Sequence, residues 1–188
     1  MSESPTPAIN GVDVGKLLGT VAAITAAPGL ADFRFRVETD WKNGGHSQTR
    51  IQGFHGADSE DTSRFAPFVL EGDEPPVLLG ANAGPNAVEM VLTGLASCLA
   101  VGFAYNAAAR GIRIEALNLR LEGEIDLHGF LGLSYTVRPG YRNIRVTCRL
   151  RSDATREQLL ALSEHVQKTS PVLDIIRNPV PVAITIET

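Results

Sequence analysis

Apolar and polar residues alternate with a period of two in several stretches of the chain, which is typical of half-buried strands. Such strands are predicted over 33–37, 112–126 and 143–152. Two more strands are expected, a return strand over 47–54 that pairs with the first and a final strand over 180–187. Asn43-Gly44-Gly45 separates the first strand from its return strand and favours a tight turn, so we expect a hairpin there. The polar stretch 55–66 predicts a loop.

A long helix is predicted over 85–110, where apolar residues recur every three or four positions. The repeating positions are Val88, Leu92, Leu95, Leu99 and Phe103. Pro85 suits the first turn, and Gly111 suits the position just past the end. The other faces hold mostly Ala, Gly, Ser and Thr, so we expect sheets or a second subunit to bury this helix nearly all round.

Two shorter helices are expected near the C-terminus. An amphipathic pattern over 155–168 begins with Thr155 and Gln158, which can form a capping box. Ser170 can cap a second helix with Pro171 at its first position, so its loss should cost stability rather than chemistry. The order of elements predicts an α+β fold, and so apolar a central helix in a short chain favours an intertwined homodimer.

The chain of 188 residues has the length of one domain, which we expect over 16–188. The start of the chain has no basic region followed by an apolar run, so it does not resemble a signal peptide. Residues 1–15 are expected to be a disordered tail. The stretch 87–109 is apolar, yet Glu89 and Asn106 interrupt it, so we expect no membrane span.

Charge and cysteine content narrow the function classes. The net charge of −4 and the absence of a basic groove predict no nucleic-acid partner and no anionic membrane surface. Two cysteines do not make a disulfide scaffold, so a reducing, cytoplasmic compartment is expected. Neither these cysteines nor the four histidines have zinc-ligand spacing, and no phosphate loop or dinucleotide fingerprint occurs; we therefore predict no metal and no cofactor.

Cys98 is the main candidate for chemistry, because small residues flank it in the middle of the long helix. It could be a nucleophilic thiolate, which would need a nearby positive charge or hydrogen-bond donor, or a buried apolar cysteine; the residues alone favour the second interpretation. Glu89 lies about 13 Å from it along the helix axis and on a different face, so it either orients another group or stabilises the first turn. Cys148 is expected on the apolar face of its strand.

The segment from Gly84 to Ala100, GPNAVEMVLTGLASCLA, resembles the cysteine helix of the family of osmotically inducible protein C and organic hydroperoxide resistance proteins (OsmC/Ohr). Ser170-Pro-Val-Leu-Asp174 and the stretch 178–182 resemble its second-cysteine helix and final strand. The resemblance covers the chain from about residue 16 onwards. It implies an OsmC-like intertwined homodimer, with a long central buried helix packed against antiparallel sheets and two sites at the subunit interface.

The resemblance also implies a chemistry. In active members the helix cysteine attacks an organic hydroperoxide, an Arg of the first hairpin and a Glu at the helix start activate it, and a second cysteine forms a disulfide. In this chain Cys98 takes the first role, Ser170 stands at the second-cysteine position, and His46 stands at the hairpin Arg. The Glu position falls on Val88 or Glu89, and 55–80 looks like an insertion.

Three functions remain open. The leading hypothesis is a one-cysteine peroxidase for oxidative-stress defence, with Cys98, Glu89 and His46 as its site and an external thiol as the reductant. The alternative is a non-catalytic dimer that binds a small hydrophobic or thiol ligand. The third is sulfur transfer at Cys98. Because Ser170 cannot form a disulfide and the reach of Cys148 to Cys98 is unsupported, we expect no internal disulfide after oxidation.

Overall fold

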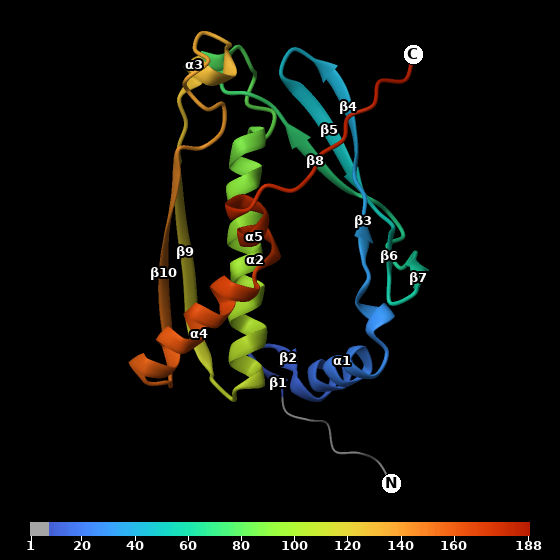
Figure 1. Ribbon diagram of the computed structural model, residues 1–188, viewed down its shortest axis with the longest axis vertical. Helices are drawn as coiled ribbons and strands as arrows, with labels where there is room; N and C mark the ends of the chain where they lie inside the picture. The colour runs from blue at the N-terminus through green and yellow to red at the C-terminus, as the bar shows by residue number, and fades with distance from the viewer. Residues whose placement is uncertain (1–7) are drawn as a thin grey trace. The chain divides into compact units, whose positions relative to one another are not determined.

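The computed structural model describes residues 8–188, which form two compact units (Figure 1). The N-terminal unit consists of residues 15–91, and the C-terminal unit consists of residues 8–14 together with 92–188. The long helix α2 (Ala87–Ala109) begins in the first and continues into the second. Each unit is described by itself.

The N-terminal unit contains the helix α1 (Val14–Ala26) and two three-stranded antiparallel sheets. One sheet consists of β3 (Arg34–Phe35), β6 (Phe54–Gly56) and β7 (Ser59–Asp61). The other consists of β4 (Glu38–Asn43), β5 (His46–Ile51) and β8 (Phe68–Gly72). Short 3₁₀ turns at Pro28–Ala31 and Pro76–Leu78 complete it.

The predicted first hairpin is confirmed at its turn. Asn43 pairs with His46, and Gly44 between them adopts a positive φ of 50°, a conformation that glycine takes without steric cost. The strand predicted over 33–37 is reduced to Arg34–Phe35, which pair with β6. The hairpin with β5 is instead formed by β4, which begins at Glu38. The predicted loop 55–66 is also wrong in part, since β6 extends into it and β7 lies within it.

Asp73 organises the connection from β8 to α2. Its carboxylate accepts backbone N–H groups of Glu74, Ala81 and Ala83 at 2.8, 2.9 and 3.0 Å, and these hydrogen bonds hold the pKa of Asp73 below its usual value. At Gly80 a Cβ atom would lie 1.8 Å from the Glu74 carbonyl oxygen, so only glycine fits there. The segment is therefore a tightly folded connection.

The C-terminal unit packs helices against one antiparallel sheet (Figure 1). The sheet pairs β9 (Ile114–Glu124) with β10 (Asn143–Ser152), and the short α3 (Leu127–Phe130) lies in their connection. The helices α4 (Arg156–Thr169) and α5 (Pro171–Arg177) follow, and β1 (Ala8–Ile9) and β2 (Val12–Asp13) form a small hairpin. Both long strands and both C-terminal helices agree with the sequence prediction to within two residues.

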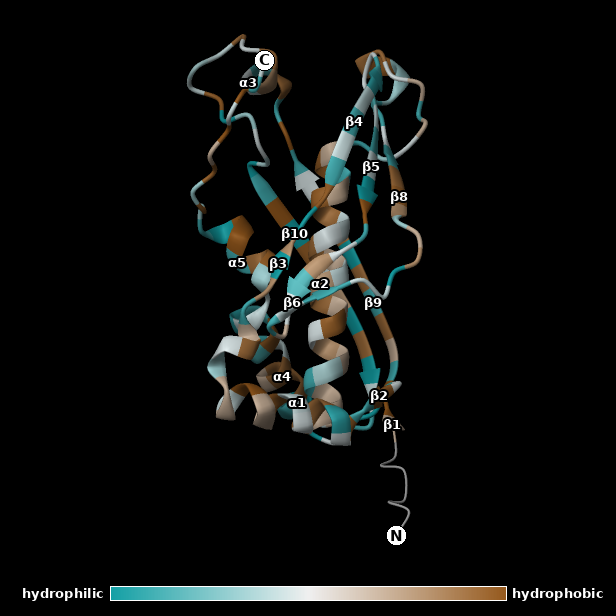
Figure 2. Ribbon diagram, turned by 90° about the vertical axis from the view of Figure 1, so that its right-hand side faces the viewer, coloured by the Kyte–Doolittle hydropathy of each residue, from teal (hydrophilic) through white to brown (hydrophobic). Residues whose placement is uncertain are grey.

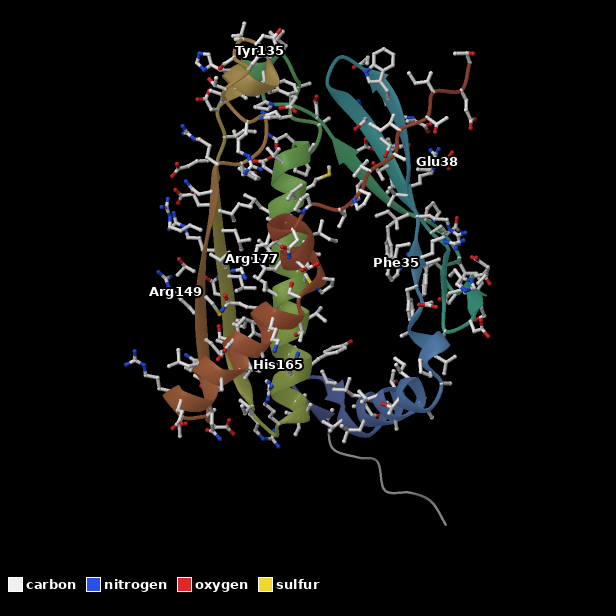
Figure 3. All side chains as sticks on the ribbon, in the orientation of Figure 1. Phe35, Glu38, Tyr135, Arg149, His165 and Arg177 are labelled. Carbon is white, nitrogen blue, oxygen red and sulfur yellow. The ribbon has the colours of Figure 1, made fainter. Side chains whose placement is uncertain are left out.

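The buried core of this unit lies where α2 meets α4, α5 and the inner face of the sheet. Its residues are Leu95, Leu99, Phe103, Ala107, Ile112, Leu162, Val166 and Leu173. Inward residues of β9 and β10 are half-buried against them, namely Ile114, Leu117, Leu119, Leu121, Ile144 and Leu150. The outer face is polar, and Figure 3 shows Arg149 pointing away from the helices there. The alternating pattern of the two strands therefore separates a core face from a solvent face.

Local hydrogen bonds define both ends of α2. Asn86 Oδ1 accepts the backbone N–H of Glu89, and the Glu89 carboxylate accepts the backbone N–H of Asn86, both at 2.9 Å. At the other end, Ile112 N–H donates to the Ala107 carbonyl while Gly111 adopts a φ of 71°. This is a Schellman ending, as the glycine at 111 predicts.

Two expectations are corrected by the structure, and the burial of α2 is shown for one chain only. Within the described chain α2 is buried on one face, and Val91, Val101 and Tyr105 are about half exposed, so cover by a second subunit stays a prediction. The final strand expected over 180–187 is an unpaired segment in the described chain. The tail expected over 1–15 is wrong for its second half, because β1, β2 and the start of α1 occupy residues 8–15; residues 1–7 lie outside the described part.

Candidate functional site

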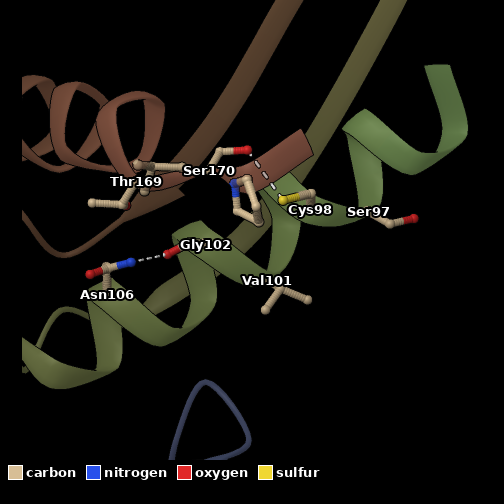
Figure 4. Close-up of a pocket in the computed structure, with 9 residues that line it drawn as sticks. Ser97, Cys98, Val101, Gly102, Asn106, Thr169 and Ser170 are labelled. Carbon is tan, nitrogen blue, oxygen red and sulfur yellow. Dashed lines mark hydrogen bonds between the residues drawn. The ribbon is translucent and has the colours of Figure 1, made fainter. Parts of the chain in front are cut away.

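Cys98 lies in the middle of α2, half-buried, beside the junction of α4 and α5. Its Sγ atom is 3.2 Å from Ser170 Oγ, the contact drawn as a dashed line in Figure 4. Ser170 is 5% exposed, so its hydroxyl faces the protein interior. The structure thus brings together two predicted site residues that are 72 positions apart in the chain.

Local sequence explains why Ser170 stands at this place. Its hydroxyl accepts the backbone N–H of Leu173 at 3.3 Å and so caps α5, and Pro171 occupies the first helical turn. The preceding helix α4 begins with the predicted capping box, in which Thr155 and Gln158 exchange hydrogen bonds. The α4–α5 junction is therefore defined by its own caps, and α2 packs against it.

The close approach of α2 and α4 depends on Gly102, one helical turn beyond Cys98. A Cβ atom at this position would lie 2.9 Å from Val166 Cγ1. Val166 is 1% exposed and has little room to move. Because Gly102 has no side chain, α4 packs close enough to α2 for Ser170 to contact the sulfur of Cys98.

A cavity of about 390 Å³ lies next to Cys98 (Figure 4). Its walls come from α2 and from the α4–α5 junction. The lining residues are Ser97, Cys98, Val101, Gly102, Asn106, Val166, Thr169, Ser170 and Pro171. Within the described chain, hydroxyls and the amide of Asn106 are the polar side chains of this lining, and no charged side chain belongs to it. Such walls suit a neutral, largely apolar molecule.

Glu89 does not contact Cys98. Its carboxylate belongs to the hydrogen-bonded first turn of α2, and nine residues of regular helix place it about 13 Å from Cys98 along the axis. Helical geometry also turns it to a different face. The structure therefore gives Glu89 a role at the helix start, and its role as the family's activating carboxylate stays a prediction.

His46 lies on β5 in the N-terminal unit, where its Nε2 atom is 2.8 Å from a carboxylate oxygen of Glu71. Gln48 donates to the other oxygen of Glu71 at 2.9 Å. These hydrogen bonds, that of Gln48 first, lower the pKa of Glu71. Sequence analysis did not identify Glu71 as the partner of His46. The two residues lie on neighbouring strands, β8 and β5, and only the register of these strands shows that their side chains meet.

Cys148 lies on β10, directly opposite Leu119 on β9, and both cysteines are free thiols. Its side chain stays partly exposed, so it is less buried than its place on the apolar face predicts. The protein around it still raises the pKa of the Cys148 thiol by desolvation. In residues 8–188, no group of three or more His, Cys, Asp or Glu side chains could hold a metal ion.

Comparison with solved structures identifies the fold. An OsmC-like protein from Mycoplasma pneumoniae is 15% identical with a TM-score of 0.58, over 78% of this chain and 89% of that one. A putative osmotic stress induced and detoxification response protein from Psychrobacter arcticus is 12% identical with a TM-score of 0.55, over 73% and 85%. The organic hydroperoxide resistance protein OsmC from Legionella pneumophila is 16% identical with a TM-score of 0.51, over 77% and 89%.

The sequence comparisons give the family. No curated protein matches the chain significantly. The model of the family described as OsmC-like protein matches residues 80–185, which is more than half of the chain and includes both Cys98 and Ser170. The chain therefore belongs to the OsmC-like protein family.

Proposed function

We propose that this protein reduces organic hydroperoxides by a one-cysteine mechanism, with Cys98 as the nucleophile. The observation that carries the proposal is the arrangement of Cys98 between an uncharged cavity and the hydroxyl of Ser170. Family membership supports the reaction type, and the related structure from Legionella pneumophila is named an organic hydroperoxide resistance protein. An uncharged lining suits the alkyl or aryl part of such a peroxide.

The reaction balances with one cysteine and an external thiol. The Cys98 thiolate attacks one peroxide oxygen, the S–O bond forms, the O–O bond breaks, and the leaving alkoxide takes a proton to become an alcohol. The sulfur is oxidised by two electrons to a sulfenic acid. An external thiol then forms a mixed disulfide with Cys98 and releases water, and a second thiol restores the Cys98 thiol as the external disulfide leaves.

Ser170 explains why the reductant must come from outside. The hydroxyl oxygen occupies the place from which a second sulfur could attack the sulfenic acid, at 3.2 Å from Cys98 Sγ. Oxygen at this position cannot form a disulfide. Cys148 lies on β10, and in the described chain it is a free thiol without a disulfide to Cys98. The sulfenic acid on Cys98 is therefore reduced only when an external thiol enters the cavity.

Intact-mass measurement after one equivalent of cumene hydroperoxide tests the proposal. We expect a dimedone adduct on Cys98 and, with a small thiol present, a mixed disulfide at the same residue. Cys98→Ser should lose both products, whereas Cys148→Ser should retain them. Without dimedone, excess peroxide should carry Cys98 on to sulfinic acid. A loss of two hydrogens with a peptide joining Cys98 to Cys148 would refute the one-cysteine mechanism.

A second candidate is a non-catalytic module that binds a small hydrophobic or thiol-bearing ligand. It is favoured by the cavity lining, which has no cationic side chain from the described residues to stabilise a thiolate. In that case the same treatment with hydroperoxide leaves the mass unchanged, while an apolar ligand still raises the melting temperature of the protein.

We further propose that the protein is a homodimer. Apolar side chains are largely exposed on several elements of the described chain, including Leu18 and Val21 of α1 and Val101 of α2. The C-terminal segment also exposes apolar side chains at every second position: Val182, Ile184 and Ile186 are each more than three-quarters exposed. Figure 2 shows that the ribbon of α2 is brown or pale over most of its length. A second copy would remove this surface from water.

The helix α2 is also long and apolar enough to cross a membrane by length and composition. Its packing favours the dimer as the explanation. One face is buried against a two-stranded sheet whose two edges carry unpaired backbone groups. Open sheet edges cannot lie in hydrocarbon without a large free-energy cost, so a second protein chain is the better cover for the other face.

A further inference from the structure

We propose that Ser170 is a positioning residue for the reactive sulfur: its hydroxyl accepts the Leu173 N–H and donates its own proton to the Cys98 thiolate. The inference rests on the proposed role of Cys98 as nucleophile. It assigns to this serine a function in the reduced protein, in addition to the capping of α5.

The direction of the hydrogen bond follows from the two contacts of one hydroxyl group. Ser170 Oγ has one proton and two lone pairs, and the Leu173 N–H at 3.3 Å uses a lone pair. The proton remains available for Cys98 Sγ at 3.2 Å. A thiolate has no proton to donate, so in the reactive form Ser170 must be the donor. The cap thereby orients the hydroxyl towards the sulfur.

The surroundings of Ser170 leave its hydroxyl with few competitors as a hydrogen-bond donor to Cys98. Ser170 is 5% exposed, so water competes little for its proton. No cationic side chain of the described residues lines the cavity. Asn106, the lining amide, donates instead to the Gly102 carbonyl at 2.9 Å. The hydroxyl of Ser170 is therefore a donor that lies at hydrogen-bonding distance from the sulfur.

Separating this role from capping needs a substitution that keeps the helix start. Glycine at an N-cap costs a helix much less stability than alanine does. Ser170→Gly thus removes the hydroxyl with little loss of the cap. Ser170→Thr keeps both the cap and the hydroxyl. Thr155→Gly, at the N-cap of α4, applies the same change to a residue that makes no contact with Cys98.

The test is the pH dependence of iodoacetamide alkylation at Cys98, measured on the full chain in a Cys148→Ser background. We expect Ser170→Gly to move the midpoint of the profile upwards by about one pH unit, because hydrogen bonds to charged groups are worth about that much. Ser170→Thr should restore the midpoint to within a few tenths of a unit, and Thr155→Gly should leave it unchanged. An unchanged midpoint in Ser170→Gly overturns the inference.

Two further readings separate this inference from the proposed function. If Ser170→Gly shifts the profile but the parent protein consumes no cumene hydroperoxide, the positioning role stands and the peroxidase proposal fails. If the parent is oxidised at Cys98 and the profile is insensitive to Ser170→Gly, the peroxidase proposal stands and Ser170 is a helix cap alone. A shift that also appears in Thr155→Gly reports lost stability, and it overturns the specific role of Ser170.

Discussion

Asp73 and Ser170 are the two buried residues with polar side chains in the part of the chain that the structure describes, at 4% and 5% exposure. Each meets its hydrogen-bonding needs through the backbone of a nearby segment: Asp73 through three N–H groups, Ser170 through Leu173. Ser170 has a second contact, on Cys98 Sγ. Buried polar groups are costly unless paired, so both residues are strong determinants of local geometry.

Replacing Ser170 by cysteine should create an internal disulfide. The two side-chain atoms are already 3.2 Å apart, and a disulfide needs Cα atoms within about 7 Å. One equivalent of organic hydroperoxide should then remove two hydrogens from Ser170→Cys, and a non-reducing peptide map should join residues 98 and 170. The parent chain, treated in the same way, should show no such link. A Ser170→Cys variant that stops at the sulfenic acid would contradict the observed geometry.

Asp73 should make stability depend on pH in the acid range. Its folded-state pKa is lowered below 3.8 by the three backbone hydrogen bonds, so its ionised form stabilises the fold. This contribution is fully present above the unfolded value and is lost as the pH falls through the folded one. We expect Asp73→Asn to have a lower free energy of unfolding than the parent at pH 7. Between pH 7 and pH 3, urea unfolding should show a smaller decrease of this free energy in the variant than in the parent. Parallel curves for both proteins would exclude this role.

At the scale of elements, helix ends and strand faces follow from short-range rules. The capping box of α4, the cap of α5 and the glycine after α2 all stand where local patterns place them. The inward and outward faces of β10 also follow the alternation. What local rules missed is that the strand predicted over 33–37 pairs with β6 in one sheet, while the following strand β4 forms the hairpin with β5 in the other, because the choice of partner strand depends on residues outside the local window.

The contact between α2 and α4 can be tested with two glycines on one helix. Gly102→Val should destabilise the fold by about 1–3 kcal/mol, because its side chain would overlap Val166. Gly94→Ala meets no atom outside its own helical turn within 4 Å in residues 8–188 and should stabilise α2 by about 0.5–1 kcal/mol. Chemical denaturation of both variants at equal protein concentration measures the difference. Equal effects would mean that the close approach at Gly102 is not needed.

At the scale of the whole molecule, the exposed apolar surface predicts self-association. Light scattering at micromolar concentration should report twice the chain mass of 20.1 kDa. Leu18→Glu, which places a charge on the apolar surface of α1, should weaken the assembly and lower the average mass. A parent protein that stays at the mass of one chain would refute the homodimer.

The candidate site was predictable to a limited extent. Cys98 and Ser170 were identified from family motifs, and the structure places them in contact. His46 and Glu89 were identified in the same way, and the structure shows hydrogen bonds of these residues to Glu71 and Asn86, while their place in the site stays a prediction. A motif gives the residue type and its place in an element. It does not give the partner, because partners come from distant segments.

By itself, the sequence determined the α+β class, the long helix, the β9 and β10 strands and the capped C-terminal helices, because each depends on side chains within a few residues of one another. Only the tertiary structure decided that α2 is covered on one face and that residues 180–187 are unpaired in this chain. It also decided that Ser170 reaches Cys98 across 72 positions. Those outcomes depend on which surfaces meet after the chain has closed long loops, and no local pattern contains that information.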